Sequence, residues 1–277
     1  MAIASLTAIN IFPVKSLGGV PASEADVEPW GLRHDRRWLV LNQDGTVLTA
    51  RAERRMLGVT ATPMDDGAIE LAARDGSSVR VGTPTTGELV STPHPRLPSF
   101  HAAGAPADDW LSDQLGRPAR LCWLDDPGRR TISEDHGGRP GEPLNLSDAG
   151  PLLLTSSASL AQLNDWMVED AGARGEAPSA PMAMARFRPT VVVDGIGAAF
   201  VEDDWRQVQI GGVEFRFAER CDRCVLTTID PQTLEMGKEP VRTLARHRQW
   251  DHKTFFGIRI IPVGTGTIRV GDGVSAA

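Results

Sequence analysis

The sequence predicts an α+β fold that is predominantly β. Short runs in which β-branched or aromatic residues alternate with polar ones recur along the chain, separated by Gly, Pro and Asp. One longer segment, residues 157–167, has the apolar spacing of a helix. The 277 residues suffice for two ordinary domains, and the Gly- and Pro-rich segment 125–143 lies near their boundary. We therefore predict one domain at residues 1–130 and a second at 131–277.

The elements of the first half follow from alternation and from turn residues. An Asp-Gly turn after the second predicted strand indicates a hairpin. Residues 108–115 are expected to form a short helix with Asp109 as its N-cap and Gly116 as its stop, after a connecting loop at 92–107. Cys122 lies in an apolar run and is interpreted as a packing residue. Strands are predicted at residues 6–12, 38–41, 46–49, 68–71, 78–81 and 120–124.

The second half combines the helix with further strands. Ser157 or Ser159 is expected to cap the helix, and residues 171–184, rich in Gly, Ala and Pro, are expected to form a flexible loop. Pro189 disfavours helical backbone at the residue before it, so Arg188 is predicted to be extended. Strands are predicted at residues 151–155, 190–193, 213–216, 225–229, 257–263 and 266–270, and a solvated turn at Asp203 and Asp204.

Composition limits the function classes. A net charge of −7 argues against a nucleic-acid-binding protein, which would normally be basic. Three cysteines, an odd number, argue against a disulfide framework and indicate a reducing compartment. The N-terminus lacks a secretory pattern, and no run approaches the roughly 18 apolar residues that a membrane span needs. We therefore expect a cytoplasmic protein with neither a nucleic-acid nor a membrane partner.

Two cysteines, Cys221 and Cys224, follow a predicted strand and have Arg220 and Arg223 beside them. Cationic neighbours favour the thiolate, which is the form that binds metals or attacks electrophiles. The pair is consistent with packing residues, a zinc site or a dithiol redox centre. The residues favour none of the three, because the turn is polar, no ligand pair has zinc-finger spacing, and the following segment is β-branched rather than helical.

Two further stretches carry groups that suit an anion. Lys15 and Ser16 lie on a Gly-rich loop, where an ammonium group, a hydroxyl and backbone N–H groups are available. Arg33, Arg36 and Arg37 precede a predicted core strand, and Arg51 follows the predicted hairpin. A guanidinium group is suited to two-pronged contacts with phosphate. Taken alone, these side chains are more simply interpreted as solvated, and segment 125–143 as an inert linker rather than a lid.

The strings RCDRCVLTTIDPQT, GKEPVRTL and FFGIRIIPVGTGTIRVGD resemble the MOSC domain, in the version found in mitochondrial amidoxime reducing components and their bacterial relatives. IFPVKSLGGVPASEADVEPWGLRHDRRWLVLNQDG resembles the N-terminal MOSC partner domain of that family. SDAGPLLLTSSASLAQLN and RFRPTVVVDG resemble the opening of the MOSC domain itself. The resemblance implies an N-terminal β-barrel-like domain followed by a MOSC β-barrel domain with a few helices.

The resemblance also implies a cofactor and its ligands. Cys224 matches the family's thiolate ligand of molybdenum in a pyranopterin cofactor, Mo-molybdopterin, and is therefore the expected metal ligand and catalytic residue. Arg223 is expected to lower the pKa of that thiol. The cofactor is expected between the two domains. The residues implied to bind it are Lys15, Ser16, Arg36, Ser147, Asp148, Arg188, Asp222, Arg223 and Arg259.

The implied activity is reduction of small N-hydroxylated substrates, such as amidoximes and hydroxylamines, with electrons from a separate protein of the ferredoxin or cytochrome b5 type. Candidate proton donors are Asp230, His34 and His136. One alternative is a carrier of the molybdenum cofactor or of sulfur without substrate turnover, since the MOSC domain is named after molybdenum-cofactor sulfurases. Another is a cofactor-free binding module that has kept the fold.

Overall fold

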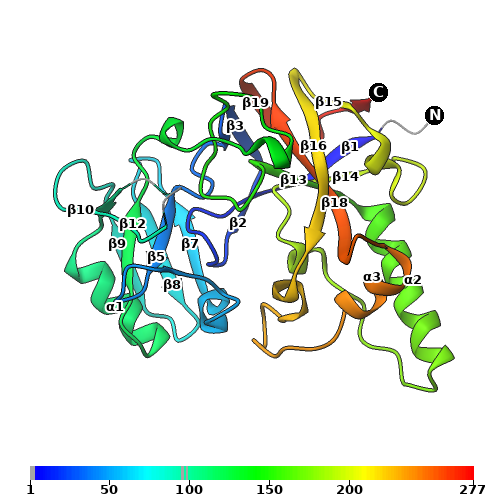
Figure 1. Ribbon diagram of the computed structural model, residues 1–277, viewed down its shortest axis with the longest axis horizontal. Helices are drawn as coiled ribbons and strands as arrows, with labels where there is room; N and C mark the ends of the chain where they lie inside the picture. Colours follow the sequence, from blue (N-terminus) through cyan, green and yellow to red (C-terminus); the bar gives the residue numbers. More distant parts are fainter. Residues whose placement is uncertain (1–3, 95–96, 98) are drawn as a thin grey trace. The chain divides into compact units, whose positions relative to one another are not determined.

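A computed structural model describes residues 4–94, 97 and 99–277 (Figure 1). The chain forms two compact units, each built from more than one segment. The first unit comprises the N-terminal residues up to Asn10, Ala22–Pro29 and Gly150–Ala277, and the second comprises Ile11–Pro21 and Trp30–Ala149. The chain passes from one unit to the other near two short strands, β2 (Val20–Ala22) and β4 (Gly31–Leu32). The predicted domain boundary at 130/131 stays a prediction.

The second unit is built on two antiparallel sheets. Its five-stranded sheet has the order β10-β11-β12-β5-β6, and its three-stranded sheet has the order β7-β8-β9. The predicted hairpin is present, because β5 pairs with β6 through Val40 and Leu48. The strands are β5 (Trp38–Leu41), β6 (Val47–Leu48), β7 (Val59–Pro63), β8 (Ile69–Ala73), β9 (Ser78–Val81), β10 (Leu89–Val90), β11 (Phe100–Ala102) and β12 (Arg120–Trp123).

Cys122 lies in the core of the second unit. Its neighbours in the buried cluster include Leu39, Phe100 and Leu146, and Cys122 itself has no exposed surface. Burial raises the pKa of the Cys122 thiol to about 12, so the group stays protonated and acts as a small apolar side chain. The predicted packing role is therefore confirmed.

Helix α1 (Ala105–Leu115) begins earlier than the sequence predicts. Its N-cap is Gly104 rather than Asp109, and a proline occupies its first turn, where the missing N–H has no consequence. Gly116 ends the helix in the left-handed conformation, as expected. The predicted loop at 92–107 was also wrong in part, because β11 lies within it; residues 95, 96 and 98 fall outside the described part.

The first unit contains one long mixed sheet. Its strands lie in the order β1-β14-β13-β18-β16-β15-β20, with β17 on β18, and only β13 and β14 run parallel among the pairs described. Separately, β3 pairs with β19. Figure 1 shows β16 and β18 running side by side. The bounds are β1 (Ser5–Ile11), β3 (Glu24–Glu28), β13 (Leu152–Ser156), β14 (Val191–Asp194), β15 (Gln207–Ile210), β16 (Val213–Arg223), β17 (Gln249–Trp250), β18 (Lys253–Pro262), β19 (Gly266–Arg269) and β20 (Val274–Ala276).

Two helices cover part of this sheet. Leu163 and Met167 of α2 (Ser157–Ala173) and Leu244 of α3 (Val241–His247) pack with Phe187 and Phe256 in one buried cluster. The 3-10 helices are η1 (Arg54–Gly58), η2 (Pro127–Arg129), η3 (Glu134–His136), η4 (Met184–Phe187), η5 (Val201–Asp204) and η6 (Val225–Thr228). Strands thus dominate, with three α-helices among the described residues, and the predicted α+β fold class is confirmed.

The segment predicted as a strand at 225–229 is instead the 3-10 helix η6. The Thr227 hydroxyl donates to the Cys224 carbonyl at 3.0 Å, and the Thr228 hydroxyl donates to the Val225 carbonyl at 2.8 Å. These local side-chain bonds stabilise a turn and override the strand preference of β-branched residues.

The two acidic residues of the predicted solvated turn, Asp203 and Asp204, differ in burial. Asp204 is exposed, but Asp203 is 5% exposed and pairs with Arg248 and with the Nε of Arg220, at 3.2 Å for the latter. The prediction is wrong for Asp203, because the two guanidinium groups compensate a carboxylate that burial would otherwise penalise. Among the described residues, no helix is both long enough and apolar enough to span a bilayer.

Glu202 is a fully buried carboxyl group beside the N-terminus of α2. Its Oε1 accepts hydrogen bonds from the hydroxyls of Ser159 at 2.6 Å and Ser156 at 3.1 Å. Ser156, rather than the predicted Ser157 or Ser159, caps the helix. Burial raises the pKa of Glu202, against the effect of the Ser159 hydrogen bond.

A raised pKa in the folded state predicts a specific dependence of stability on pH. The contribution of Glu202 to the free energy of unfolding is fully present below the unfolded pKa, near 4.5, and is lost as pH rises through the folded pKa. Glu202→Gln keeps a hydrogen-bond acceptor and removes the charge. The melting temperature of this variant should therefore rise relative to that of wild type as the pH is raised from 5 to 8. Glu202→Ala should lose stability at both pH values, by about 1–3 kcal/mol. Parallel melting-temperature curves for wild type and Glu202→Gln would contradict the assignment.

Candidate functional site

The two cysteines of the first unit occupy different environments. Cys221 lies within β16, is 4% exposed, and points its Sγ toward the Asp222 carbonyl at 3.6 Å. Cys224 follows the end of that strand as the N-cap of η6, and its side chain is exposed. A packing role therefore suits Cys221 but not Cys224.

The geometry of the two cysteines supports neither the zinc hypothesis nor the dithiol hypothesis. Within the described residues, no three or more His, Cys, Asp or Glu side chains gather as a metal site would require. The dithiol hypothesis expects both cysteines at the start of an α-helix. Instead, Cys221 is inside a strand and only Cys224 begins a helix, a single 3-10 turn.

Arg223 is a half-buried cation next to the exposed cysteine. Its Nε donates to the Phe256 carbonyl at 3.0 Å, and its guanidinium carbon lies 5.3 Å from the Phe187 ring centroid. Burial lowers the pKa of Arg223, while the neighbouring thiols Cys221 and Cys224 act in the opposite direction. Its Nη2 is buried and finds no hydrogen-bond acceptor among the described residues. A buried donor left in this way is costly unless a ligand supplies the acceptor.

Arg259 lies across the sheet from these residues, opposite Glu219 of β16. Its Nη2 donates to Asp222 Oδ1 at 2.8 Å, and its Nη1 donates to Glu219. Burial acts to lower the pKa of Arg259, but Cys221 and the two carboxylates raise it overall. In return Arg259 holds the pKa of Asp222 below its usual range despite burial. The pair orients a carboxylate two residues before Cys224.

Arg188 differs in backbone conformation from the prediction. Its φ and ψ are 53° and 47°, in the left-handed region, rather than extended. The Arg188 N–H closes η4 by donating to the Ala185 carbonyl at 3.1 Å, so the chain reverses just before Pro189. Pro189 disfavours the right-handed helical conformation at Arg188, and the left-handed conformation ends η4.

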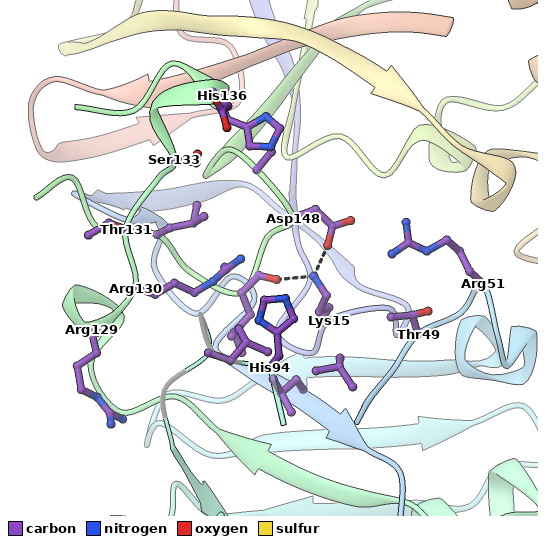
Figure 2. A pocket seen from close by; sticks show the side chains of 17 residues that line it. Lys15, Thr49, Arg51, His94, Arg129, Arg130, Thr131, Ser133, His136 and Asp148 are labelled. Atoms are coloured by element: carbon purple, nitrogen blue, oxygen red, sulfur yellow. Dashed lines mark hydrogen bonds and ion pairs between the residues drawn. The ribbon is translucent and has the colours of Figure 1, made fainter. Parts of the chain in front are cut away.

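The second unit contains a cavity of about 890 Å³ (Figure 2). This volume is in the range of small-molecule and cofactor sites. Lys15 and Asp148 form an ion pair at its centre, and the Lys15 Nζ also donates to the Leu146 carbonyl at 2.8 Å. The other polar lining residues are Thr49, Arg51, His94, Arg129, Arg130, Thr131, Ser133, Asp135 and His136.

Positive charge dominates around Lys15. Burial lowers the pKa of Lys15; the Asp148 carboxylate opposes this effect, and Arg130 and Arg36 add to it. Burial also lowers the pKa of Arg130, whose Nη1 donates to the Asn145 carbonyl. The Asp148 carboxylate therefore faces several cations, and these cations favour an added anion.

The remaining predicted residues of this unit surround the cavity without lining it. Arg36 pairs with buried Asp35 and lies over the Phe12 ring, 4.9 Å from its centroid. The Ser147 N–H donates to the Asn145 side chain at 2.9 Å. Ser16 occupies a turn with φ of 70°. The structure thus brings Lys15 and Asp148 together in the cavity, with Arg36 close enough to act on Lys15 electrostatically.

Segment 125–143 is part of the site rather than an inert linker. Arg129, Arg130, Thr131, Ser133 and His136 line the cavity. Two arginines in a Gly- and Pro-rich stretch were visible in the sequence, but nothing local indicated that the segment folds back beside Lys15. Figure 2 shows Arg130 extending toward Lys15 and Asp148.

Strained backbone marks several predicted residues. Among the described residues, eight non-glycine residues have positive φ, and three of them are predicted cofactor-binding residues: Ser16, Arg36 and Arg188. Such conformations cost free energy and concentrate at functional sites. The observation supports these three positions independently of their residue types.

The candidate proton donors Asp230 and His136 lie in different environments. Asp230 accepts backbone hydrogen bonds from Gln232 and Thr233 and pairs with Arg186 at 2.8 Å. These contacts hold the pKa of Asp230 below its usual range, so it is ionised at neutral pH and poorly suited to donate a proton. His136 lines the cavity of the second unit.

The fold and these residues define a two-part β-rich protein with an exposed cysteine at a strand end and a cationic cavity. The family model for the MOSC domain matches residues 141–275, and that for the MOSC N-terminal beta barrel domain matches residues 3–118. The chain belongs to the MOSC family.

Two human proteins of similar sequence agree with this assignment. Human mitochondrial amidoxime-reducing component 1 is 33% identical over 291 residues, covering 98% of this chain and 82% of that protein. Human mitochondrial amidoxime reducing component 2 is 31% identical over 295 residues, covering 98% and 83%. The crystal structure of the YUAD protein from Bacillus subtilis has 11% identity and a TM-score of 0.43, covering 98% of this chain and 94% of that one.

The difference between the cysteines predicts their reactivity. In metal-free native protein, one thiol per chain, Cys224, should react rapidly with dithionitrobenzoate, and all three should react after unfolding in guanidinium chloride. Cys224→Ser should abolish the rapid phase, whereas Cys221→Ser should keep it. A rapid phase that survives in Cys224→Ser would contradict the assigned exposures.

Proposed function

We propose that this protein is a molybdenum-cofactor-dependent reductase of N-hydroxylated compounds. The observation that carries the proposal lies at the end of β16. There exposed Cys224 follows Arg223, whose buried Nη2 has no acceptor among the described residues. A thiolate is a soft ligand suited to molybdenum, and an adjacent unsatisfied cationic donor suits an anionic cofactor. The printed names of the relatives, amidoxime-reducing components, point to the same chemistry.

Each unit, taken by itself, offers groups that suit an anionic pterin cofactor. In the first unit, Cys224 would bind the metal, and Arg223 and Arg188 would contact the pterin. In the second unit, Lys15 and Arg130 supply half-buried positive charge that suits a phosphate, and Arg36 is close enough to act on Lys15 electrostatically. When bound, the cofactor would supply the two-electron reduction of an N–O bond.

The protein groups then have distinct tasks. Arg259 fixes the Asp222 carboxylate two residues before the metal ligand, and Arg223 compensates negative charge beside Cys224. The Asp148 carboxylate opposes the desolvation that lowers the pKa of half-buried Lys15, and so favours the charged amine. These groups are held before the ligand arrives, so little reorganisation is needed on binding.

The proposed reaction consumes an amidoxime or hydroxylamine, two electrons and two protons, and yields the amidine or amine and water. The electrons come from a separate electron-transfer protein of the ferredoxin or cytochrome b5 type. We also propose a cytoplasmic location. A carrier of the cofactor or of sulfur is the alternative that the exposed Cys224 equally permits, and turnover distinguishes it.

Metal content and turnover of the cysteine variants test the proposal together. Protein expressed in a host that makes the cofactor should contain close to one molybdenum per chain and reduce benzamidoxime with dithionite-reduced methyl viologen. Cys224→Ser should lose at least 100-fold in kcat/KM, because the metal loses its protein ligand. Cys221→Ser should lose less than 10-fold, since that thiol is buried.

The outcomes separate the alternatives. Loaded protein without turnover would exclude the reductase and leave the carrier. Equal losses in Cys221→Ser and Cys224→Ser would favour a site that uses both thiols. Absence of molybdenum from correctly folded protein would leave the cofactor-free binding module.

A further inference from the structure

A hairpin of the first unit lies beside the proposed metal ligand. Strand pairing aligns Gln249 of β17, Thr254 of β18 and Arg223 of β16 in one row across three strands. The next row along pairs Trp250 with Lys253, and Cys224 is the residue that follows Arg223. The turn of the β17–β18 hairpin and Cys224 are therefore at the same end of the sheet.

The hairpin turn has a constrained backbone. Asp251 and His252 both have positive φ, 49° and 62°, as in a two-residue turn of the type that matches strand twist. Asp and His enter this left-handed region more readily than most non-glycine residues, so the local sequence suits a tight two-residue turn.

Trp250 is held firmly while much of it stays exposed. The guanidinium carbons of Arg248 and Arg220 lie 4.8 and 5.6 Å from its ring centroid, and the Phe255 ring lies 5.5 Å away. Both arginines pair with one oxygen, Oδ2, of buried Asp203, which holds them beside the indole. Yet 45% of Trp250 is exposed. The indole is therefore held by its neighbours while nearly half of the residue stays open to a ligand.

We propose that Trp250 forms an aromatic subsite for the planar group of the substrate. Two strand spacings place the Cα atoms of Trp250 and Cys224 roughly 10 Å apart. A small aryl amidoxime with its N-hydroxyl group near the metal would reach an indole at that distance. A ring already fixed by cations loses little conformational entropy on stacking, which favours a planar partner.

This inference rests on the proposed reductase function and specifies its substrate class. Aryl amidoximes and aryl hydroxylamines should be preferred over aliphatic ones. The preference arises from stacking on Trp250 and is independent of the N–O reduction itself, so the two can be tested separately.

Substrate preference in matched variants tests the subsite. The ratio of kcat/KM for benzamidoxime to that for acetamidoxime should fall about tenfold in Trp250→Leu, mainly through KM for benzamidoxime, and Trp250→Phe should restore most of it. Val270→Thr serves as the control, because Val270 is also 45% exposed in the same unit but lies outside the hairpin. Its ratio should equal that of wild type. An unchanged ratio in Trp250→Leu, or an equal loss with both substrates, would overturn the subsite.

A binding measurement separates this inference from the proposed function. Calorimetric titration of molybdenum-loaded protein with benzamidoxime, without a reductant, should give a dissociation constant about tenfold weaker in Trp250→Leu. If wild type binds in this Trp250-dependent way but shows no turnover, the subsite stands and the reductase assignment fails. If binding is the same in both proteins, the subsite is wrong whatever the turnover.

Discussion

The antiparallel pairing of β16 with β18 is the interaction on which the first-unit site depends. It places Glu219 opposite Arg259, Asp222 opposite Phe255 and Arg223 opposite Thr254. The register shifts twice along this pair, between Phe217 and Glu219 and between Arg220 and Asp222. Irregularities of this kind bend a strand and increase its twist, and they occur frequently next to active sites. The strand therefore reaches Cys224 with a direction that regular pairing would not give.

The arginines of this protein differ in how their charge is compensated. Arg259 and Arg248 each reach a carboxylate, which offsets the cost of removing a guanidinium from water. Arg223 is half-buried and acted on by the thiols and by Asp222, but its buried Nη2 has no acceptor among the described residues. Around Lys15, the cations Lys15, Arg36 and Arg130 likewise outnumber the carboxylates that act on Lys15. Uncompensated positive charge is where an anionic ligand gains the most.

Sequence reasoning recovered the features that local patterns encode. Alternating residues located most strands, and the resemblance located Lys15 and Asp148, which the structure brings into one cavity. Sequence reasoning failed where contacts between distant segments determine the environment of a residue. Asp203 is buried because Arg220 and Arg248, from distant segments, pair with it. Arg130 lines the cavity because its loop folds back toward Lys15. The left-handed Arg188 also escaped prediction, since Pro189 excludes one conformation without choosing between the others.

The different burial of the two cysteines could not be read from their spacing. In a regular strand, residues three apart point to opposite faces, but Cys224 lies past the end of β16, where the Thr227 hydroxyl bonds to its carbonyl and turns the chain. Cys221 stays in the sheet and is covered, while Cys224 is exposed at the turn. Thr227, which sequence reasoning assigned to a strand, thus helps to present the thiol. The error in predicting η6 and the exposure of the proposed metal ligand have the same physical cause.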